Sequence, residues 1–177
     1  RRNNVMSDSK SSSKKLWGGR FEEATAQSVE AFTASIHYDS RLYKYDIAGS
    51  RAHAQMLSDN GVLSKDELKS IFDGLAEIEA AIEAGTFEFR RELEDIHMNI
   101  EKALVEKIGP AGAKLHSARS RNDQISLDLK LYLRDECDRI MDLLDEVCTA
   151  FVKLARVYLG KIMPGYTHMQ RAQPVLL

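Results

Sequence analysis

The chain has 177 residues, of which 44% are hydrophobic and 29% are charged, as expected of a globular protein with one or two domains. Lys and Arg number 25 against 27 Asp and Glu, and no basic stripe with interleaved aromatic residues occurs, so we expect no nucleic-acid partner. No run of 18 apolar residues exists, so we expect no membrane span. The N-terminus lacks an apolar signal segment, which indicates a cytoplasmic protein.

The N-terminal part of the chain changes composition at residue 16. Residues 1–15 are mostly Arg, Asn, Ser, Lys and Asp, which predicts a disordered tail or, ahead of Met6, a cloning remnant. The sequence Leu-Trp-Gly-Gly-Arg-Phe at residues 16–21 then introduces apolar side chains, and we interpret it as an arm anchored by Trp17. Residues 16–121 are predicted to form an N-terminal helical domain.

Apolar residues at helical spacing predict helices over residues 22–35, 40–60, 64–85 and 94–107. Asp39 is the expected N-cap of the second helix, and Ser64 with Glu67 matches a capping box at the start of the third. His97 follows the start of the fourth helix, where it is either a site residue or a capping partner. Residues 112–120 are predicted to be a loop.

Residues 122–159 contain neither Gly nor Pro and predict one long helix of about 55 Å, capped by Asn122 or Asp123. Its apolar residues face more than one side, so other subunits or further chain must cover it. Cys137 and Cys148 are too far apart on it for a disulfide, and we expect buried thiols. No β-type alternation occurs, so the predicted fold is all-α.

Two polar blocks flank this helix, at residues 115–124 and 164–174. In the second block, Pro164-Gly165 predicts a turn, and Pro174 predicts a break or the first turn of a new helix. The blocks supply hydroxyl, amide, imidazole and guanidinium groups. Such loops between helices are a common way to build a polar site.

The polar side chains favour a site for a small anion with more than one carboxylate. Arg119 and Arg121 can clamp carboxylates, although surface salt bridges would also explain them. Asn122 lies at a helix start, which attracts anions, and a histidine can move a proton. The five histidines share no metal-ligand spacing, and no nucleophile elbow or phosphate-binding glycine loop occurs, so no metal is expected.

The motifs at residues 16–21, 94–97, 117–124 and 164–174 together resemble the argininosuccinate lyase family of the fumarase/aspartase superfamily, which also includes the lens δ-crystallins. The resemblance implies an N-terminal helical domain and, over residues 122–177, the truncated start of a central helical bundle. It also implies cleavage of argininosuccinate to arginine and fumarate, no cofactor, and a homotetramer in the full-length form.

The resemblance further implies roles for individual residues. His168 would be the acid/base histidine, and His97 would line the pocket and orient the reacting groups. Thr167 would act at both the catalytic and the binding site. The implied substrate-binding residues are Ser35, Arg119, Arg121, Asn122, Thr167 and Gln170.

The family's mobile serine loop, a nearby lysine and a small C-terminal domain have no counterpart in this chain, so we predict that the chain alone is inactive. Another lyase of the superfamily, such as adenylosuccinate lyase, is an alternative, although no phosphate-binding groups occur. A non-catalytic protein of the δ-crystallin type is a second alternative, and a helical interaction module a third.

Overall fold

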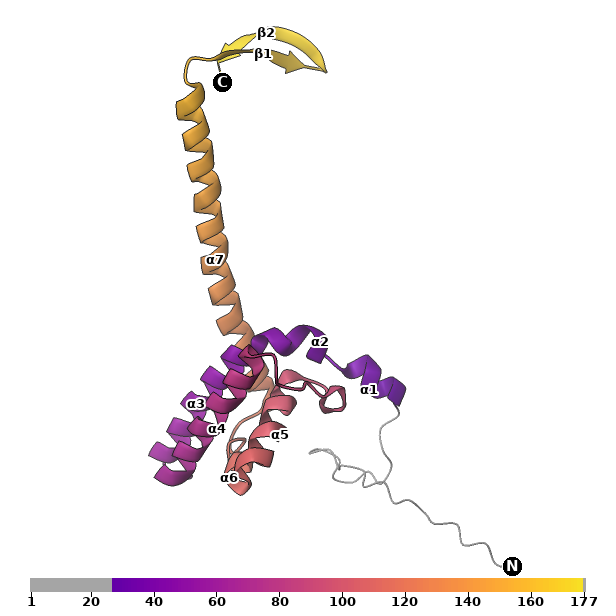
Figure 1. Ribbon diagram of the computed structural model, residues 1–177, viewed down its shortest axis with the longest axis vertical. Coiled ribbons are helices and arrows are strands. Elements are labelled where there is room, and N and C mark those ends of the chain that lie inside the picture. The colour runs from indigo at the N-terminus through magenta and orange to yellow at the C-terminus, as the bar shows by residue number, and fades with distance from the viewer. Residues whose placement is uncertain (1–26, 177) are drawn as a thin grey trace, which may run out of the picture. The chain divides into compact units, whose positions relative to one another are not determined.

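The computed structural model describes residues 27–176, and the chain divides into two compact units, residues 1–129 and 130–177 (Figure 1). We call them the first and the second unit. The predicted tail at residues 1–15 and the arm at residues 16–21 lie outside the described residues. No helix in the described part of the chain is both long and apolar enough to cross a membrane.

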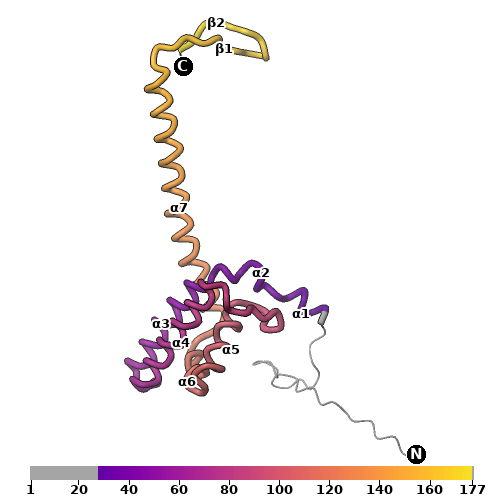
Figure 2. Tube along the Cα trace, viewed as in Figure 1, coloured from indigo at the N-terminus to yellow at the C-terminus, as the bar shows by residue number. Residues whose placement is uncertain are grey.

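The first unit is helical, as predicted. Its elements are α1 (Gln27–Thr33), α2 (Ile36–Asp39), the 3₁₀ turn η1 (Ser40–Leu42), α3 (Tyr43–Asp59), α4 (Lys65–Glu83), the 3₁₀ turn η2 (Arg91–Leu93), α5 (Ile96–Ile108) and α6 (Pro110–Lys114). Helix α4 packs against both α3 and α5 (Figures 1 and 2). The predicted loop at residues 112–120 is thus partly helical, because Pro110 starts a short helix after Gly109.

Local capping explains two of these helix starts. The side chain of Ser64 accepts a hydrogen bond from the Glu67 backbone, and the Glu67 side chain accepts one from the Ser64 backbone, which confirms the capping box. Asp95 caps α5 by accepting from the Met98 backbone N–H at 2.7 Å. The prediction that Asp39 caps α3 was wrong, because α2 and η1 precede α3 and the Asp39 carboxylate is used in a tertiary contact.

The core of the first unit lies between α3, α4 and α5. Its fully buried side chains include Ile47, Leu57, Ile71, Leu75, Ile78, Ile96 and Leu104. Gly74 permits the close approach of α4 to α5, because a Cβ atom at this position would lie 2.8 Å from the Leu104 Cδ1 atom. Substitution of Gly74 therefore requires the Leu104 side chain to shift.

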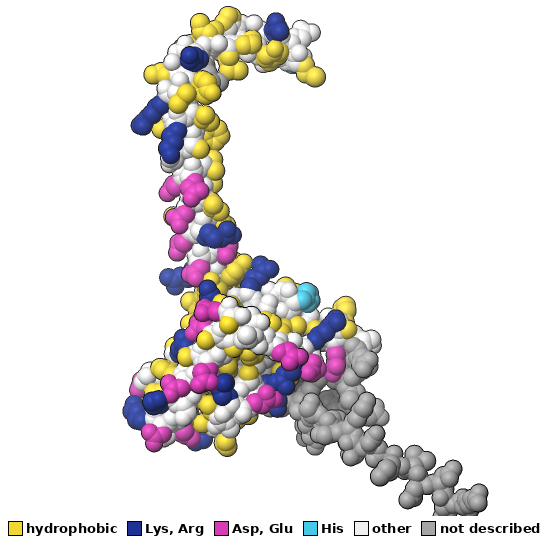
Figure 3. All heavy atoms as spheres, in the orientation of Figure 1, with side chains coloured by type: hydrophobic (Ala, Val, Ile, Leu, Met, Phe, Trp, Pro, Cys, Tyr) yellow, Lys and Arg dark blue, Asp and Glu magenta, His cyan; other side chains and the backbone are white. Residues whose placement is uncertain are grey.

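Helix α7 (Arg121–Tyr158) begins in the first unit and continues into the second. The Ser120 side chain accepts a hydrogen bond from the Asn122 backbone N–H, so neither Asn122 nor Asp123 is the cap. Beyond residue 130 the apolar side chains of α7 are largely exposed and run along the helix (Figure 3). Cys137 and Cys148 are exposed as well, so the expectation of buried thiols was wrong, because no described element of the second unit covers them.

The second unit ends in an antiparallel hairpin of β1 (Ile162–Thr167) and β2 (Gln170–Leu176) (Figure 2). No strand was expected here. The predicted turn at Pro164-Gly165 was wrong, and so was the predicted break or helix start at Pro174, which lies inside β2. Pro164 pairs with Pro174 inside the hairpin, which two edge strands tolerate because each needs a partner on one side only. An exposed hairpin buries neither face, so no apolar alternation marks it in the sequence.

Candidate functional site

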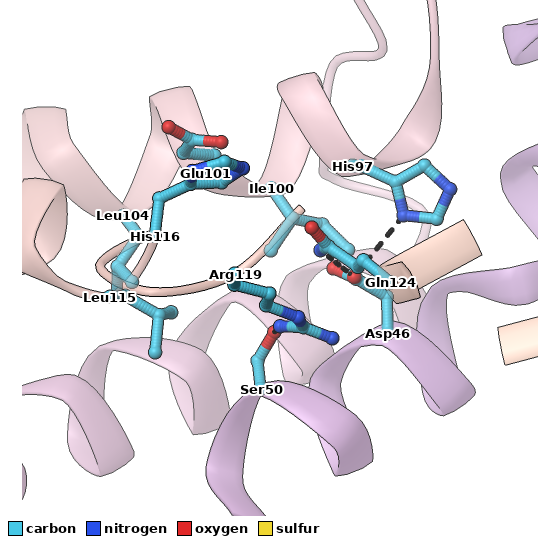
Figure 4. Close-up of a pocket in the computed structure, with 10 residues that line it drawn as sticks. All are labelled: Asp46, Ser50, His97, Ile100, Glu101, Leu104, Leu115, His116, Arg119 and Gln124. Atoms are coloured by element: carbon cyan, nitrogen blue, oxygen red, sulfur yellow. Dashed lines mark hydrogen bonds and ion pairs between the residues drawn. The ribbon is translucent and has the colours of Figure 1, made fainter. Parts of the chain in front are cut away.

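A small polar cavity of about 20 Å³ lies inside the first unit (Figure 4). Helices α3 and α5, the segment after α6 and the start of α7 supply its walls. Its lining residues are Asp46, Ser50, His97, Ile100, Glu101, Leu104, Leu115, His116, Arg119 and Gln124. A volume of this size holds about one water molecule, so the cavity alone has no room for a substrate.

His97 is the most deeply buried titratable base at this cavity, with 2% of its side chain exposed. Its Nδ1 atom lies 3.2 Å from Asp46 Oδ1 and 3.2 Å from Asp128 Oδ2. Burial opposes the charged imidazole, but the carboxylates of Asp128 and Asp46 outweigh it and raise the pKa of His97 to about 9. Of the two predicted roles for His97, capping partner or site residue, the structure excludes capping, since Asp95 caps α5.

A chain of hydrogen bonds connects Asp46 to the predicted substrate-binding residue Arg121. Gln124 donates from its amide nitrogen to Asp46 and accepts from Arg121 Nη1 at 2.7 Å. Arg121 also forms an ion pair with Glu101. Its Nη2 atom also donates to Met98 Sδ at 3.4 Å. A guanidinium group has five N–H donors, so these three partners leave donors of Arg121 for a further carboxylate.

Arg119 points toward α3, where its Nη1 atom donates to Ser50 Oγ at 3.1 Å. A Cβ atom on the neighbouring Gly49 would lie 3.1 Å from Leu127 Cδ2 and 3.4 Å from Arg119 Nη2, so α3 lies close to both side chains here. Burial lowers the pKa of Arg119, while the nearby Asp46 and Asp128 act in the opposite direction. Arg119 is half-buried, and its guanidinium donates to a hydroxyl group of α3, which counts against the surface-salt-bridge interpretation.

Ser35 is tied to the start of α5. Its hydroxyl donates to Asp39 Oδ2 at 2.6 Å, and Asp39 Oδ1 accepts from the Ile96 backbone N–H at 3.2 Å. The Ser35 backbone N–H donates to the Glu94 carbonyl at 2.8 Å. Ser35 thus contacts Glu94 directly and the Ile96 backbone through Asp39, and His97 is the next residue after Ile96.

In the second unit, Thr167 and Gln170 face each other across the turn of the hairpin, and His168 and Met169 form the turn. All four residues are exposed. His168 has φ of 49° and Met169 has φ of 61°, a left-handed pair that glycine or asparagine usually occupies. Non-glycine residues held in this region often mark functional sites, because the strain must be compensated elsewhere.

The predicted residues thus fall into two groups. Ser35, His97, Arg119, Arg121 and Asn122 belong to the first unit, and Asn122 is exposed at the start of α7. Thr167, His168 and Gln170 belong to the second unit. Each group is a local arrangement of polar side chains within its own unit.

Four residues of the cavity and its His97 cluster were not predicted from the sequence. They are Asp46, Glu101, Gln124 and Asp128. A signal was present for two of them, since Gln124 and Asp128 are four residues apart in the predicted helix and therefore share one face. The structure buries both side chains. Asp46, buried beside Ile47, gave no such signal because its partners come from distant parts of the chain.

The side-chain oxygen and nitrogen atoms of Asp46, His97 and Asp128 that face one another lie within 4.8 Å. A metal ion at this position would need an unprotonated imidazole nitrogen, so it would compete with the proton on His97.

Comparison with known proteins identifies the family. A family profile described as Lyase matches residues 19–177. The chain is 67% identical over 165 residues to the argininosuccinate lyase of Desulfotalea psychrophila, covering 93% of this chain and 36% of that protein. It is 56% identical over 163 residues to the argininosuccinate lyase of Pelotomaculum thermopropionicum, covering 92% of this chain and 35% of that protein. The chain thus spans about a third of the length of the curated relatives that it matches.

Two solved structures agree in fold. A crystal structure of EDDS lyase in complex with formate has a TM-score of 0.63 and 33% identity, over 77% of this chain and 26% of that one. An EDDS lyase variant with bound fumarate has a TM-score of 0.64 and 30% identity, over 87% of this chain and 31% of that one. The predicted helical fold of the fumarase/aspartase type is confirmed, apart from the terminal hairpin. This chain is a member of the lyase family and is similar in sequence to argininosuccinate lyases.

Proposed function

We propose that the full-length protein that contains this chain cleaves argininosuccinate to arginine and fumarate. The observation that carries the proposal is the 67% identity to an argininosuccinate lyase over 165 residues. The fumarate bound in an EDDS lyase variant adds support, because that protein shares the fold at 30% identity.

The side chains suit this reaction. Removal of a proton next to a carboxylate places negative charge on that carboxylate, so the site must supply donors that are already in position. We assign Arg119 and Arg121 to the carboxylates of the substrate, which guanidinium groups bind with two parallel hydrogen bonds. Ser35, Asn122 and Gln170 are assigned to its remaining polar groups.

We assign acid/base catalysis to His168, with Thr167 beside it as a hydroxyl donor and His97 as a group that orients the substrate. Histidine suits proton transfer because its ordinary pKa lies near neutral pH. The exposed position of His168 and its left-handed backbone support the assignment. No metal or organic cofactor is needed for a reaction that consists of proton removal and loss of a nitrogen.

We propose that the 177-residue chain is inactive alone, because its internal cavity of about 20 Å³ is too small for the substrate. The serine loop that the family resemblance implies is expected elsewhere in the full-length protein. We further propose that this protein is a cytoplasmic homotetramer. The exposed apolar side chains of the second unit support association; they include Ile140, Leu144, Val147, Phe151, Leu154 and Val157.

The test is an absorbance assay for fumarate after argininosuccinate is added to the purified full-length protein, with the 177-residue chain in parallel. We expect fumarate from the full-length protein and none above background from the chain alone. An intact full-length assembly that releases no fumarate would overturn the proposal. Adenylosuccinate, added in the same assay, separates a different succinyl substrate from a δ-crystallin-type protein that turns over neither.

A further inference from the structure

Asp46 and Asp128 have no role in the proposed reaction, yet they are the most deeply buried acidic residues of the described chain. Their side chains are 1% and 0% exposed. Buried carboxylates are costly unless a charge or several hydrogen bonds compensate them. Their burial beside a residue of the proposed active site therefore calls for a physical reason.

Both carboxylates approach the same atom, Nδ1 of His97, at 3.2 Å each. Asp46 has a second donor in Gln124. Neither oxygen of Asp128, in contrast, receives a well-oriented hydrogen bond from any described residue. A neutral imidazole with its proton on Nδ1 offers Asp46 and Asp128 one N–H between them, whereas an imidazolium adds a positive charge beside both carboxylates.

The other charged groups around the cluster do not change this conclusion. Asp95, at the start of α5, adds a third negative charge that favours a protonated His97. Arg119 lies near Asp46 and Asp128 and donates to Ser50. Arg121 is paired with Glu101. Burial raises the pKa of Asp95 and of Asp128, and the charges of His97 and Arg119 lower that of Asp128. One positive charge from Arg119 does not balance the three carboxylates, and a proton on His97 supplies a second.

We propose that Asp46 and Asp128 are positioning residues that keep His97 an imidazolium through the catalytic cycle, so that His97 supplies a fixed positive charge and transfers no proton. This role rests on the proposed function, since it places the charge beside the proposed carboxylate site. Fixed positive charge stabilises a carboxylate on which negative charge builds up. Proton transfer is then left to other groups, His168 among them.

The orientation of the cluster supports the same role. Arg121 donates to Gln124, Gln124 donates to Asp46, and Asp46 accepts from His97 Nδ1. This chain fixes the imidazole ring relative to Arg121, which we assign to a substrate carboxylate. A substitution at Asp46 is therefore expected to disturb both the charge and the orientation of His97, whereas one at Asp128 disturbs mainly the charge.

The primary test is an NMR titration of the full-length protein with ¹³C-labelled histidine rings, in which the His97→Gln spectrum identifies the His97 signal. We expect His97 to remain protonated well above pH 7.5 in the unsubstituted protein. The Asp128→Asn variant is expected to lower its titration midpoint by at least about one pH unit. Asp73→Asn, which removes the same charge at an exposed position of α4, is the matched control and is expected to change nothing.

A His97 signal that titrates near pH 6.5 in the unsubstituted protein would overturn the proposal without any need for a variant to fold. An unchanged midpoint in folded Asp128→Asn would also overturn it. A change in the His97 signal when a chelator is added to the purified protein would show that the three side chains hold a metal instead of a proton.

Activity measurements connect the cluster to the reaction. In Asp128→Asn, we expect kcat to fall about 10- to 100-fold with little change in KM, together with a new loss of activity as pH rises through the lowered midpoint. A change in KM alone would contradict a role for the charge in the transition state. The titration needs no substrate, so failure of the fumarate assay alone refutes the proposed reaction and leaves the protonated cluster standing.

Discussion

Both units contain amphipathic helices, but the apolar faces of these helices are buried in the first unit and exposed in the second. In the first unit, Ile47, Leu75 and Leu104 are 0% exposed. In the second unit, Phe151 is 69% exposed and Val157 is 67% exposed. The first unit therefore completes its own core, whereas the second presents surfaces and polar groups that need partners. Substitutions of apolar residues should accordingly reduce stability in the first unit, whereas in the second unit they should affect assembly more than stability.

The largest expected effect is the loss of turnover in His168→Asn, made in the full-length protein. Removing a general acid or base reduces kcat by about 10²- to 10⁴-fold. Thermal stability should hardly change, because His168 is exposed at the end of a hairpin. Fumarate release and thermal unfolding are measured together, with His37→Asn at an exposed position of α2 as control. Unchanged turnover in His168→Asn would show that the assignment is wrong.

Leu75→Ala and Leu144→Ala compare the two units directly. In the 177-residue chain, Leu75→Ala should reduce the free energy of unfolding by about 3 kcal/mol, because it leaves a cavity in the core. Leu144 is 57% exposed, so its substitution should change that free energy by less than about 0.5 kcal/mol.

In the full-length assembly, Leu144→Ala should become as costly as a core substitution if other subunits cover α7. Urea unfolding of the chain and sedimentation of the assembly measure the two effects. If both substitutions reduced the free energy of unfolding of the isolated chain equally, the proposed difference in burial between the two units would be wrong.

The first unit should also lose stability as pH rises. Its buried His97 has a pKa raised to about 9, above the unfolded value of 6.5. The resulting stabilisation is complete below pH 6.5 and is lost as pH rises through 9, a change on the order of 3 kcal/mol. Urea midpoints at several pH values measure it, and His97→Gln should flatten the dependence over this window. The same slope in both proteins would mean that another group causes it.

The features predicted correctly from the sequence are those that depend on interactions between residues close together in the chain. The capping box at Ser64 and Glu67 and the stop at Gly85 involve residues close together in the chain, and both were found. The cluster around His97 could not be predicted in this way, because Asp46 and Asp128 reach it from α3 and α7. The position of the cluster depends on how α3, α5 and α7 pack together, and the spacing of residues within one helix carries no information about that packing.

The hairpin was not predicted from the sequence for a different reason. Proline and glycine at Pro164-Gly165 are typical of turns, but here Gly165 accompanies an irregularity in the strand pairing. A Cβ atom on Gly165 would lie 3.0 Å from the Gln173 carbonyl oxygen, so the glycine serves the close approach of the strands. The turn itself lies at His168 and Met169, which carry no turn signal.

The smallest expected effect concerns this turn. In Met169→Gly, the left-handed backbone at φ 61° no longer strains a side chain, which relieves about 1–2 kcal/mol. Greater freedom of glycine in the unfolded chain offsets about 0.5–1 kcal/mol of that gain. The hairpin should therefore become slightly more stable, measured as slower hydrogen exchange of its backbone amides in the 177-residue chain.

If the strain at residues 168 and 169 serves to hold the imidazole in position, the same Met169→Gly variant of the full-length protein should lose part of its turnover while its hairpin gains protection. Gly85→Ala, at a left-handed position in the first unit, is the contrasting control, and it should cost stability without an effect on kcat. Full turnover in Met169→Gly would mean that the left-handed pair only closes the hairpin. Greater protection of the hairpin amides together with lower turnover would show that the strained backbone at residues 168 and 169 contributes to catalysis.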